Sequence, residues 1–234
     1  MNTAIRAVAH EPRWDGTVAE YPPWCPLSAD LLVVAAHPDD EVRGAGGLIH
    51  AWVARGGTVR VLSVSDGEPA DPRCGALASA RREELNAALR TLCPTHVAVT
   101  RLGVPLGRIG QHLNRLRNAL LPLASGKVTL LAPNERAGHP DHEAVGRVCA
   151  QFARARGIPL ARYAIGQYGI GPARTAARDS GPRWVKFVLA DDARRAKARA
   201  MQCFRSRSHF RRDRTVPSGR ATQAPERAYE AFLV

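Results

Sequence analysis

Two short stretches of the chain combine histidine with neighbouring carboxylates at spacings suited to metal chemistry. The first is AAHPDDE (35–41), which continues the apolar run LLVVAA, and the second is GHPDH (138–142), which follows KVTLLAP. Borderline ions such as zinc favour imidazole and carboxylate ligands. A catalytic zinc site uses three protein ligands and leaves one position open for water. Together the two stretches indicate a catalytic metal site.

The first stretch can supply two ligands from a single loop, because His37 and Asp40 are three positions apart. The third ligand must then come from the second stretch, where either His139 or His142 can provide it. Asp39 would remain unligated beside the metal. The structural alternative is that an Asp at such a position only caps a helix, but two His-Pro-Asp loops in one sheet favour the metal.

The segments that must position these stretches alternate between strand and helix patterns. Apolar and β-branched runs predict strands at 31–36, 58–65, 96–102, 127–133, about 160–167 and 184–190. Helical spacing of apolar residues predicts helices at 42–55, 76–92, 109–123, about 141–156 and 191–204. This order is typical of an α/β fold with a Rossmann-like, mostly parallel sheet and helices on both faces. Ligands bind beyond the carboxyl ends of such strands, where both stretches lie.

We expect one domain over residues 31–234, with residues 1–30 as an N-terminal arm packed on it. The glycines of GAGG (44–47) follow the first strand, but the G-x-G-x-x-G fingerprint of dinucleotide binding is absent. Close packing of the helix on a strand explains these small residues. Hydrophobic residues make up 45% of the chain, which is sufficient for a full core.

Two features of the composition bear on the compartment. No apolar run approaches the roughly 20 residues of a transmembrane helix, and the N-terminus lacks the apolar core of a signal peptide. The five cysteines are scattered without a C-x-x-C pair, which argues against a disulfide framework and a thiolate zinc site. We therefore expect a cytoplasmic protein with no transmembrane segment.

The net charge of +13 comes mostly from one region. Residues 151–234 hold 18 Lys and Arg against 6 Asp and Glu, and the arginines are dense in a basic C-terminal segment at about 204–220. Such a segment can steer an anionic substrate or bind nucleic acid. The second use defines the alternative function, a basic nucleic-acid-binding protein on a non-catalytic Rossmann-like scaffold.

The sequence resembles the PIG-L/LmbE-like family of zinc-dependent N-deacetylases from about Leu31 onward. The resemblance rests on AHPDDE (36–41), GG (46–47), SDGE (65–68), R-x-x-E (81–84), RLG-x-P (101–105) and GHPDH (138–142). The family removes acetyl groups from N-acetylated amino sugars, such as N-acetylglucosamine, and from related glycosides. The AHPDDE and HPDH loops together are the specific part of this pattern.

The resemblance implies a role for each residue of the two loops. His37, Asp40 and His142 would hold one Zn²⁺, for which Fe²⁺ or Co²⁺ are possible substitutes. Asp39 would be the general base toward zinc-bound water, His139 would stabilise the oxyanion as a protonated imidazole, and Asp141 would orient His139. The expected activity is hydrolysis of an N-acetyl or longer N-acyl amide.

Substrate contacts are less constrained by the sequence. Arg43, Asp66 and Glu68 lie in segments expected at the same sheet edge and can bind sugar hydroxyls or a phosphate. The expected substrate is a small N-acetyl amino sugar or its conjugate, with nucleotide-linked and lipid-linked sugars as the anionic candidates, and no nucleic acid partner. Natural-product biosynthesis is one context for such an enzyme. The chain departs from the family pattern at Leu106, where relatives often carry Asp, and at Arg207, where many carry Gln.

Overall fold

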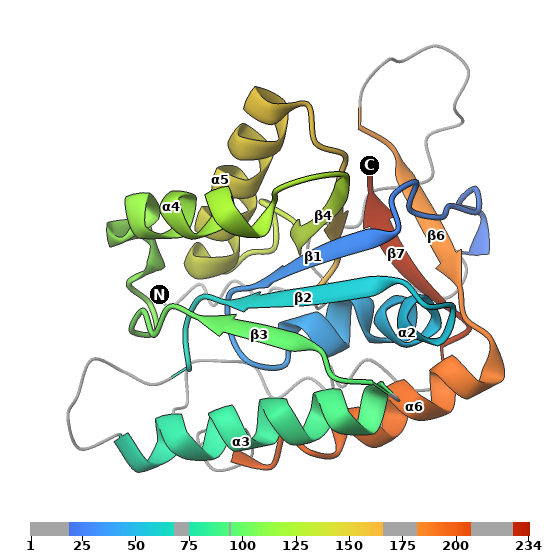
Figure 1. Ribbon diagram of the computed structural model, residues 1–234, viewed down its shortest axis with the longest axis horizontal. Helices are drawn as coiled ribbons and strands as arrows, with labels where there is room; N and C mark the ends of the chain where they lie inside the picture. The colour runs from blue at the N-terminus through green and yellow to red at the C-terminus, as the bar shows by residue number, and fades with distance from the viewer. Residues whose placement is uncertain (1–18, 68–74, 94, 166–181, 207–226) are drawn as a thin grey trace, which may run out of the picture.

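The computed structural model describes residues 19–67, 75–93, 95–165, 182–206 and 227–234, and these form one seven-stranded sheet with helices on both faces (Figure 1). The strand order is β3-β2-β1-β4-β5-β7-β6. The strands are β1 (Asp30–Ala35), β2 (Thr58–Ser63), β3 (Ala98–Arg101), β4 (Val128–Pro133), β5 (Leu160–Tyr163), β6 (Trp184–Val188) and β7 (Tyr229–Leu233).

The predicted mostly parallel sheet is confirmed. Strands β1 to β5 pair in parallel, whereas β7 pairs antiparallel with both β5 and β6. Strand β7 is absent from the sequence prediction because YEAFL is short and has no neighbouring helix pattern to frame it. It nevertheless lies inside the sheet, and its Phe232 is fully buried.

The helices form two layers. Helices α2 (Asp40–Ala54), α3 (Gly75–Leu92) and α6 (Asp191–Met201) contact one another on one face. The 3-10 turn η2 (Ile109–Gln111) and helices α4 (Leu113–Leu123) and α5 (Pro140–Arg156) cover the other face (Figure 1). Strand β1 is covered on both sides, since Leu31 and Val33 enter one core and Leu32 and Val34 the other. This explains its continuous apolar sequence.

The described part of the N-terminal arm packs on β6. Pro23 forms a parallel bridge with Lys186, and the ring of Tyr21 stacks on Trp184 with a centroid distance of 6.0 Å. No helix among the described residues is both long enough and apolar enough to cross a bilayer.

Strand order places the two histidine loops side by side. The chain runs from β1 outward to β2 and β3 and then returns to form β4 on the other side of β1. The ends of β1 and β4 therefore flank the point where the strand order reverses, which is where open α/β sheets bind ligands. The loops after these two strands contain AHPDDE and GHPDH.

Candidate metal centre

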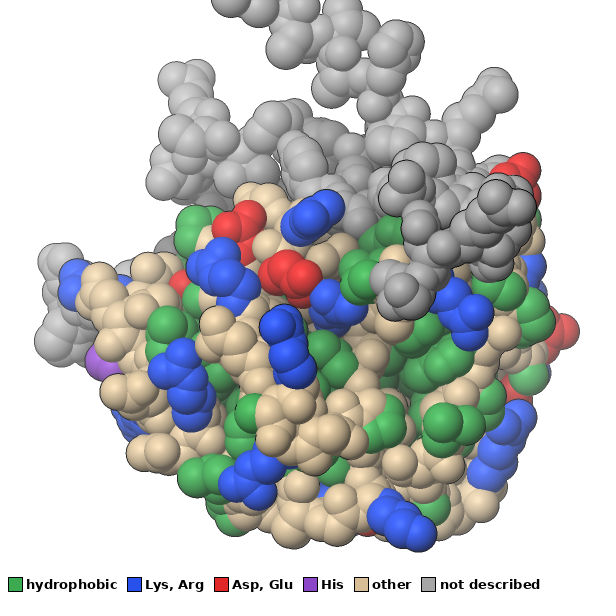
Figure 2. All heavy atoms as spheres, turned by 90° about the horizontal axis from the view of Figure 1, so that it is seen from above, with side chains coloured by type: hydrophobic (Ala, Val, Ile, Leu, Met, Phe, Trp, Pro, Cys, Tyr) green, Lys and Arg blue, Asp and Glu red, His purple; other side chains and the backbone are tan. Residues whose placement is uncertain are grey.

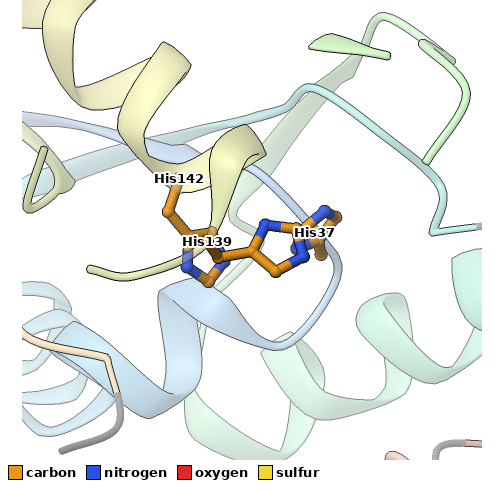
Figure 3. A group of neighbouring side chains, drawn as sticks. All are labelled: His37, His139 and His142. Carbon is orange, nitrogen blue, oxygen red and sulfur yellow. The ribbon is translucent and has the colours of Figure 1, made fainter. Parts of the chain in front are cut away.

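Three imidazoles meet where the loop after β1 faces the start of α5 (Figure 3). One nitrogen from each of His37, His139 and His142 lies within 4.8 Å of the others, so this group could hold a metal ion. The ring centroids are 4.9 to 5.1 Å apart. Residues from two loops far apart in the sequence are thus brought within reach of a single ion.

His37 is held by a carboxylate on each side of its ring. Its Nε2 lies 2.9 Å from Oδ2 of Asp141, and its Nδ1 lies 3.7 Å from Oδ2 of Asp40. A carboxylate that accepts a hydrogen bond from one imidazole nitrogen fixes the tautomer and directs the other nitrogen at a metal. With Asp141 at Nε2, Nδ1 is the nitrogen of His37 that lies on the side of Asp40.

Asp40 and His142 form a close buried pair, with Oδ2 of Asp40 3.0 Å from Nε2 of His142. Burial alone raises the pKa of Asp40, but His142 and His37 outweigh it and hold this pKa well below its usual value. Burial alone lowers the pKa of His142, but Asp40 outweighs it and the pKa is raised. Asp40 is consequently ionised and ready to bind a cation.

Two donor separations at Asp40 can be compared with those around a tetrahedral ion. Zinc bonds of about 2.0–2.1 Å place neighbouring ligand atoms about 3.3 Å apart. The two separations from Oδ2 of Asp40, 3.7 Å to His37 and 3.0 Å to His142, bracket that value. All three side chains are at least largely buried. Nε2 of His142 makes no hydrogen bond of acceptable geometry within the described chain, so an ion bound there would give this buried atom a partner.

His139 differs from the other two imidazoles because it caps a helix. It is the N-cap of α5, and its Nδ1 accepts a hydrogen bond of 3.2 Å from the backbone N–H of Asp141. Burial, with help from His37 and His142, lowers the pKa of His139. A neutral ring that accepts at Nδ1 carries its proton on Nε2. His139 is therefore arranged as a neutral donor, which differs from the protonated imidazole expected above.

The carboxylate of Asp141 contacts His37 and the loop before η2. Its Oδ2 accepts from the N–H of Gly107 at 2.7 Å, and its Oδ1 accepts from the N–H of Ile109 at 3.2 Å. Burial raises the pKa of Asp141, but the bonds from His37 and Gly107 outweigh it and lower the pKa. The sequence led us to expect this carboxylate on His139, whereas only the Asp141 backbone contacts that ring.

Asp39 occupies an unusual backbone conformation between Pro38 and α2. Its φ of 106° makes it the only non-glycine residue with positive φ in the described chain. Side chains rarely adopt this region, and such strain concentrates at functional sites. Nη1 of Arg43 lies 4.0 Å from Oδ2 of Asp39, so Arg43 lies next to the expected base.

The remaining expected substrate residues have different surroundings. Asp66 is buried, with its carboxylate oxygens 3.4 Å from Nε of Arg82 and 3.9 Å from Nε of Arg101. Burial raises the pKa of Asp66 despite these two cations. Glu68 lies outside the described residues, as does most of the basic segment at about 204–220.

Two parts of the family pattern bind backbone groups. Arg81 donates to the carbonyl of Gly67, and Glu84 accepts from the N–H groups of Arg205 and Ser206 and from the Ser206 hydroxyl. The R-x-x-E segment thus holds the loop after β2 and the segment that follows α6. The spacing of Arg81 and Glu84 by itself would favour a local pair between them on one helix.

One acidic residue of the AHPDDE loop received no role from the sequence. Glu41 is fully buried, and its Oε2 accepts from the N–H of Asp39 at 3.3 Å. Burial, with help from Asp39 and Asp40, raises the pKa of Glu41 well above its usual value. Glu41 therefore supports the Asp39 backbone from inside the core through this hydrogen bond. Its place in a run of three carboxylates was the signal available in the sequence.

The chain matches the family model described as PIG-L, GlcNAc-PI de-N-acetylase, over residues 32–153. This range contains both histidine loops. Two curated relatives from Mycobacterium strains KMS and JLS, each a 1D-myo-inositol 2-acetamido-2-deoxy-alpha-D-glucopyranoside deacetylase, are 29% identical over 196 residues, covering 69% of this chain. The chain spans 63% of the length of these relatives.

Solved structures share the fold. The conserved protein TT1542 from Thermus thermophilus is 26% identical, with a TM-score of 0.53 over 74% of this chain and 78% of that chain. The A40926 pseudoaglycone deacetylase Dbv21 is 22% identical, with a TM-score of 0.62 over 87% of this chain and 95% of that chain.

Proposed function

The chain belongs to the PIG-L family, and from this premise we propose that it is a metal-dependent hydrolase that removes an N-acetyl group from an amino sugar. The observation that carries the proposal is the buried group of His37, Asp40 and His142 with Asp39 beside it. Its ligand types and spacing suit an ion with one open position.

We assign the metal to His37, Asp40 and His142, and zinc is the expected ion. When bound, it supplies a Lewis acid that lowers the pKa of water and polarises an acetyl carbonyl. Asp40 contributes the negative charge of the site. The carboxylate of Asp141 holds His37 in the tautomer that binds through Nδ1. The hydrogen bond at Nδ1 of His139 is the reason to prefer Asp40 over His139 as third ligand.

Asp39 is assigned as the general base. It directly precedes the proposed ligand Asp40. Pro38 restrains the backbone before it, and its own N–H donates to Glu41. Its carboxylate would take a proton from the attacking water and deliver it to the departing amine nitrogen, which balances the hydrolysis. Nη1 of Arg43 lies 4.0 Å from Oδ2 of Asp39, so a cation lies next to the assigned base.

His139 is assigned as the donor to the oxyanion that forms on the substrate. The bond from the Asp141 backbone keeps the proton on Nε2, so a neutral ring can donate without first gaining a proton. Removing one such donor typically costs about 10²–10³ in turnover. The pKa of His139, which is lowered by burial and by His37 and His142, agrees with a neutral donor.

The substrate proposed is a small N-acetyl amino sugar or conjugate. The mycobacterial relatives act, by name, on a 2-acetamido-2-deoxyglucopyranoside of inositol, and we extend that sugar class to this chain. Arg43 is a cation 4.0 Å from the carboxylate of the assigned base and is our candidate contact for an anionic conjugate. Asp66 is the weaker candidate, since two arginines already surround its buried carboxylate.

The nucleic-acid alternative has less support. On the face shown in Figure 2, the Lys and Arg side chains are separated from one another by other surface and form no continuous patch among the described residues. A binder would also leave a complete set of metal-binding side chains unused. Its affinity for DNA or RNA would fall steeply with salt and would not need metal.

The deciding experiment is a deacetylation screen on the metal-analysed protein. Free, nucleotide-linked and lipid-linked N-acetyl amino sugars are incubated with it, and released acetate is measured with and without a chelator. We expect chelator-sensitive acetate release from at least one class. Matched N-butanoyl sugars test longer acyl groups. A zinc-loaded protein that is inert on every acetyl and acyl substrate would contradict the proposal.

A further inference from the structure

Helix α2 is interrupted shortly after it leaves the metal centre. Ala45 has φ −142° and ψ 15°, which are not helical, so the segment Asp40–Gly44 and the rest of the helix meet at a kink. Such a break leaves backbone N–H groups after it and carbonyl groups before it without helical partners. The surroundings are buried, so each of these groups requires a partner from elsewhere.

A single ion pair supplies those partners on both sides of the break. Glu230 of β7 accepts from the N–H of Gly47 at 2.8 Å and from the N–H of Leu48 at 2.9 Å. Lys197 of α6 donates to the carbonyl of Arg43 at 2.8 Å and to Glu230 at 2.6 Å. We call these two side chains the α2 clamp.

The charges of the α2 clamp suit the two helix ends that it joins. Glu230 places a carboxylate at the N-terminus of the second segment, and Lys197 places a cation at the carbonyl end of the first. Both residues are buried, at 4% and 8% exposure respectively. Buried ion pairs add little net stability, because desolvation opposes their attraction. Their value here lies in fixing a geometry.

Close packing prevents the two segments from straightening against the sheet. A Cβ on Gly44 would lie 2.1 Å from the ring of Tyr163 in β5, and one on Gly47 would lie 2.4 Å from Leu189. The backbone on both sides of the break is thus pressed against neighbouring elements. The clamp then determines the angle at which the first segment leaves.

We propose that Lys197 and Glu230 are positioning residues for the metal centre. Their ion pair sets the bend of α2 and thereby the position of Asp40 and Arg43, both of which lie on the first segment. This inference rests on the proposed function, since it assigns consequences to Asp40 as a metal ligand. It connects α6 and β7, from the last part of the chain, to a site built from earlier segments.

The test compares Glu230→Gln and Lys197→Met with Leu85→Ala, a buried substitution in α3 on the same face of the sheet. Zinc affinity is measured by chelator competition, and the visible spectrum of the Co²⁺-loaded protein reports the ligand geometry. We expect the clamp variants to bind zinc about 10–100-fold more weakly and to shift the Co²⁺ spectrum. Turnover should fall mainly through kcat. Leu85→Ala should lower the unfolding temperature but leave these properties unchanged.

A second measurement needs no metal. Amide hydrogen exchange at Gly47 and Leu48, relative to other amides of α2, should be slow in wild type and selectively faster in Glu230→Gln. If a single variant folds too poorly, Lys197→Met/Glu230→Gln removes both charges and leaves no unpaired ion. Clamp variants that match Leu85→Ala in zinc affinity, spectrum and relative exchange would overturn the inference. A wild-type chain that binds zinc but deacetylates nothing would instead refute the proposed function and leave these measurements valid.

Discussion

The two His-Pro-Asp loops contain the same three residues, but the helix that follows begins at a different position relative to them. In the first loop the helix begins after the tripeptide, with Asp39 as the N-cap in a left-handed conformation and without a side-chain cap bond. In the second loop the helix begins inside the tripeptide, with His139 as the N-cap and Pro140 in the first turn. The two aspartates therefore have different tasks. Asp39 lies beside the proposed ion, whereas Asp141 contacts His37 of the other loop.

Helices α5 and α2, which follow these loops, also differ in how far their own sequence stabilises them. Helix α5 has a cap, Pro near its start, acidic residues in its first turn, basic residues in its last turn and Gly157 in a left-handed C-cap. Each of these is a local signal for a helix. Helix α2 has a break that Lys197 and Glu230 bridge. The bend of the helix after the strained loop is thus bridged by distant residues, whereas the start and end of α5 carry their own local signals.

The largest effect is expected from removing the ligand on the regular helix. His142→Ala should lose both zinc and all measurable turnover, because two ligands remain. His139→Ala is the matched control on the same helix and should keep zinc while losing about 10²–10³ in turnover. Metal analysis and acetate release measure both. Full zinc occupancy in His142→Ala would make His139 the ligand.

The next largest effect is expected at Asp39, the proposed general base in the strained loop. Asp39→Ala should retain zinc and lose about 10²–10⁴ in turnover, since proton transfer is removed and the ligands stay. Metal analysis and acetate release are again the measurements. Turnover near that of wild type at equal zinc content would remove Asp39 from this role.

Weakening the contact between Asp141 and His37, which joins the two loops, should have a smaller effect. Asp141→Asn weakens the bond to His37 and to the loop at Gly107, so zinc affinity should fall about 10–100-fold. Asp66→Asn, another buried carboxylate at this sheet edge, serves as control and should bind zinc normally. Equal affinities for the two variants would mean that Asp141 does not support His37.

Measuring zinc affinity over a range of pH tests whether zinc and a proton compete for His142. The raised pKa of His142 means that the metal-free chain gains stability from the His142–Asp40 pair at low pH and loses it as pH rises through that pKa. Zinc needs the neutral ring, so zinc affinity should rise about tenfold per pH unit below the pKa of His142 and level off above it. The plateau should begin above about 6.5, the usual histidine value. A zinc affinity that is independent of pH between about 5 and 8 would show that zinc does not displace a proton from His142.

The smallest effect concerns the backbone of the strained loop. Both Asp39→Gly and Asp39→Ala lack the carboxylate, but only glycine adopts a φ of 106° without strain. Asp39→Gly should therefore be more stable than Asp39→Ala by about 1 kcal/mol in thermal or denaturant unfolding. Equal stabilities would show that the loop relaxes to another conformation once the side chain is gone.

The sequence alone predicted strands β1 to β6, the helices and the two histidine loops, because each depends on local patterns, whereas it missed β7. The run LLVVAA is apolar throughout since β1 is buried on both faces, and the spacing of apolar residues in α3 and α5 follows the helical period. The candidate site residues were identified from types and spacing, and they are His37, Asp39, Asp40, His139, Asp141 and His142. Their assigned roles remain predictions that the variants above examine.

What the sequence determined by itself was the chemistry of the side chains and the end of the sheet where they would gather. Tertiary structure decided the partners: Asp141 with His37 rather than with His139, Glu84 with Ser206 rather than with Arg81, and Glu230 with the break in α2. The physical reason is that helix and strand periods are local, whereas a buried polar group binds whichever partner the folded chain brings within about 3 Å. Those partners lie up to 183 positions away in the chain, so no spacing rule identifies them.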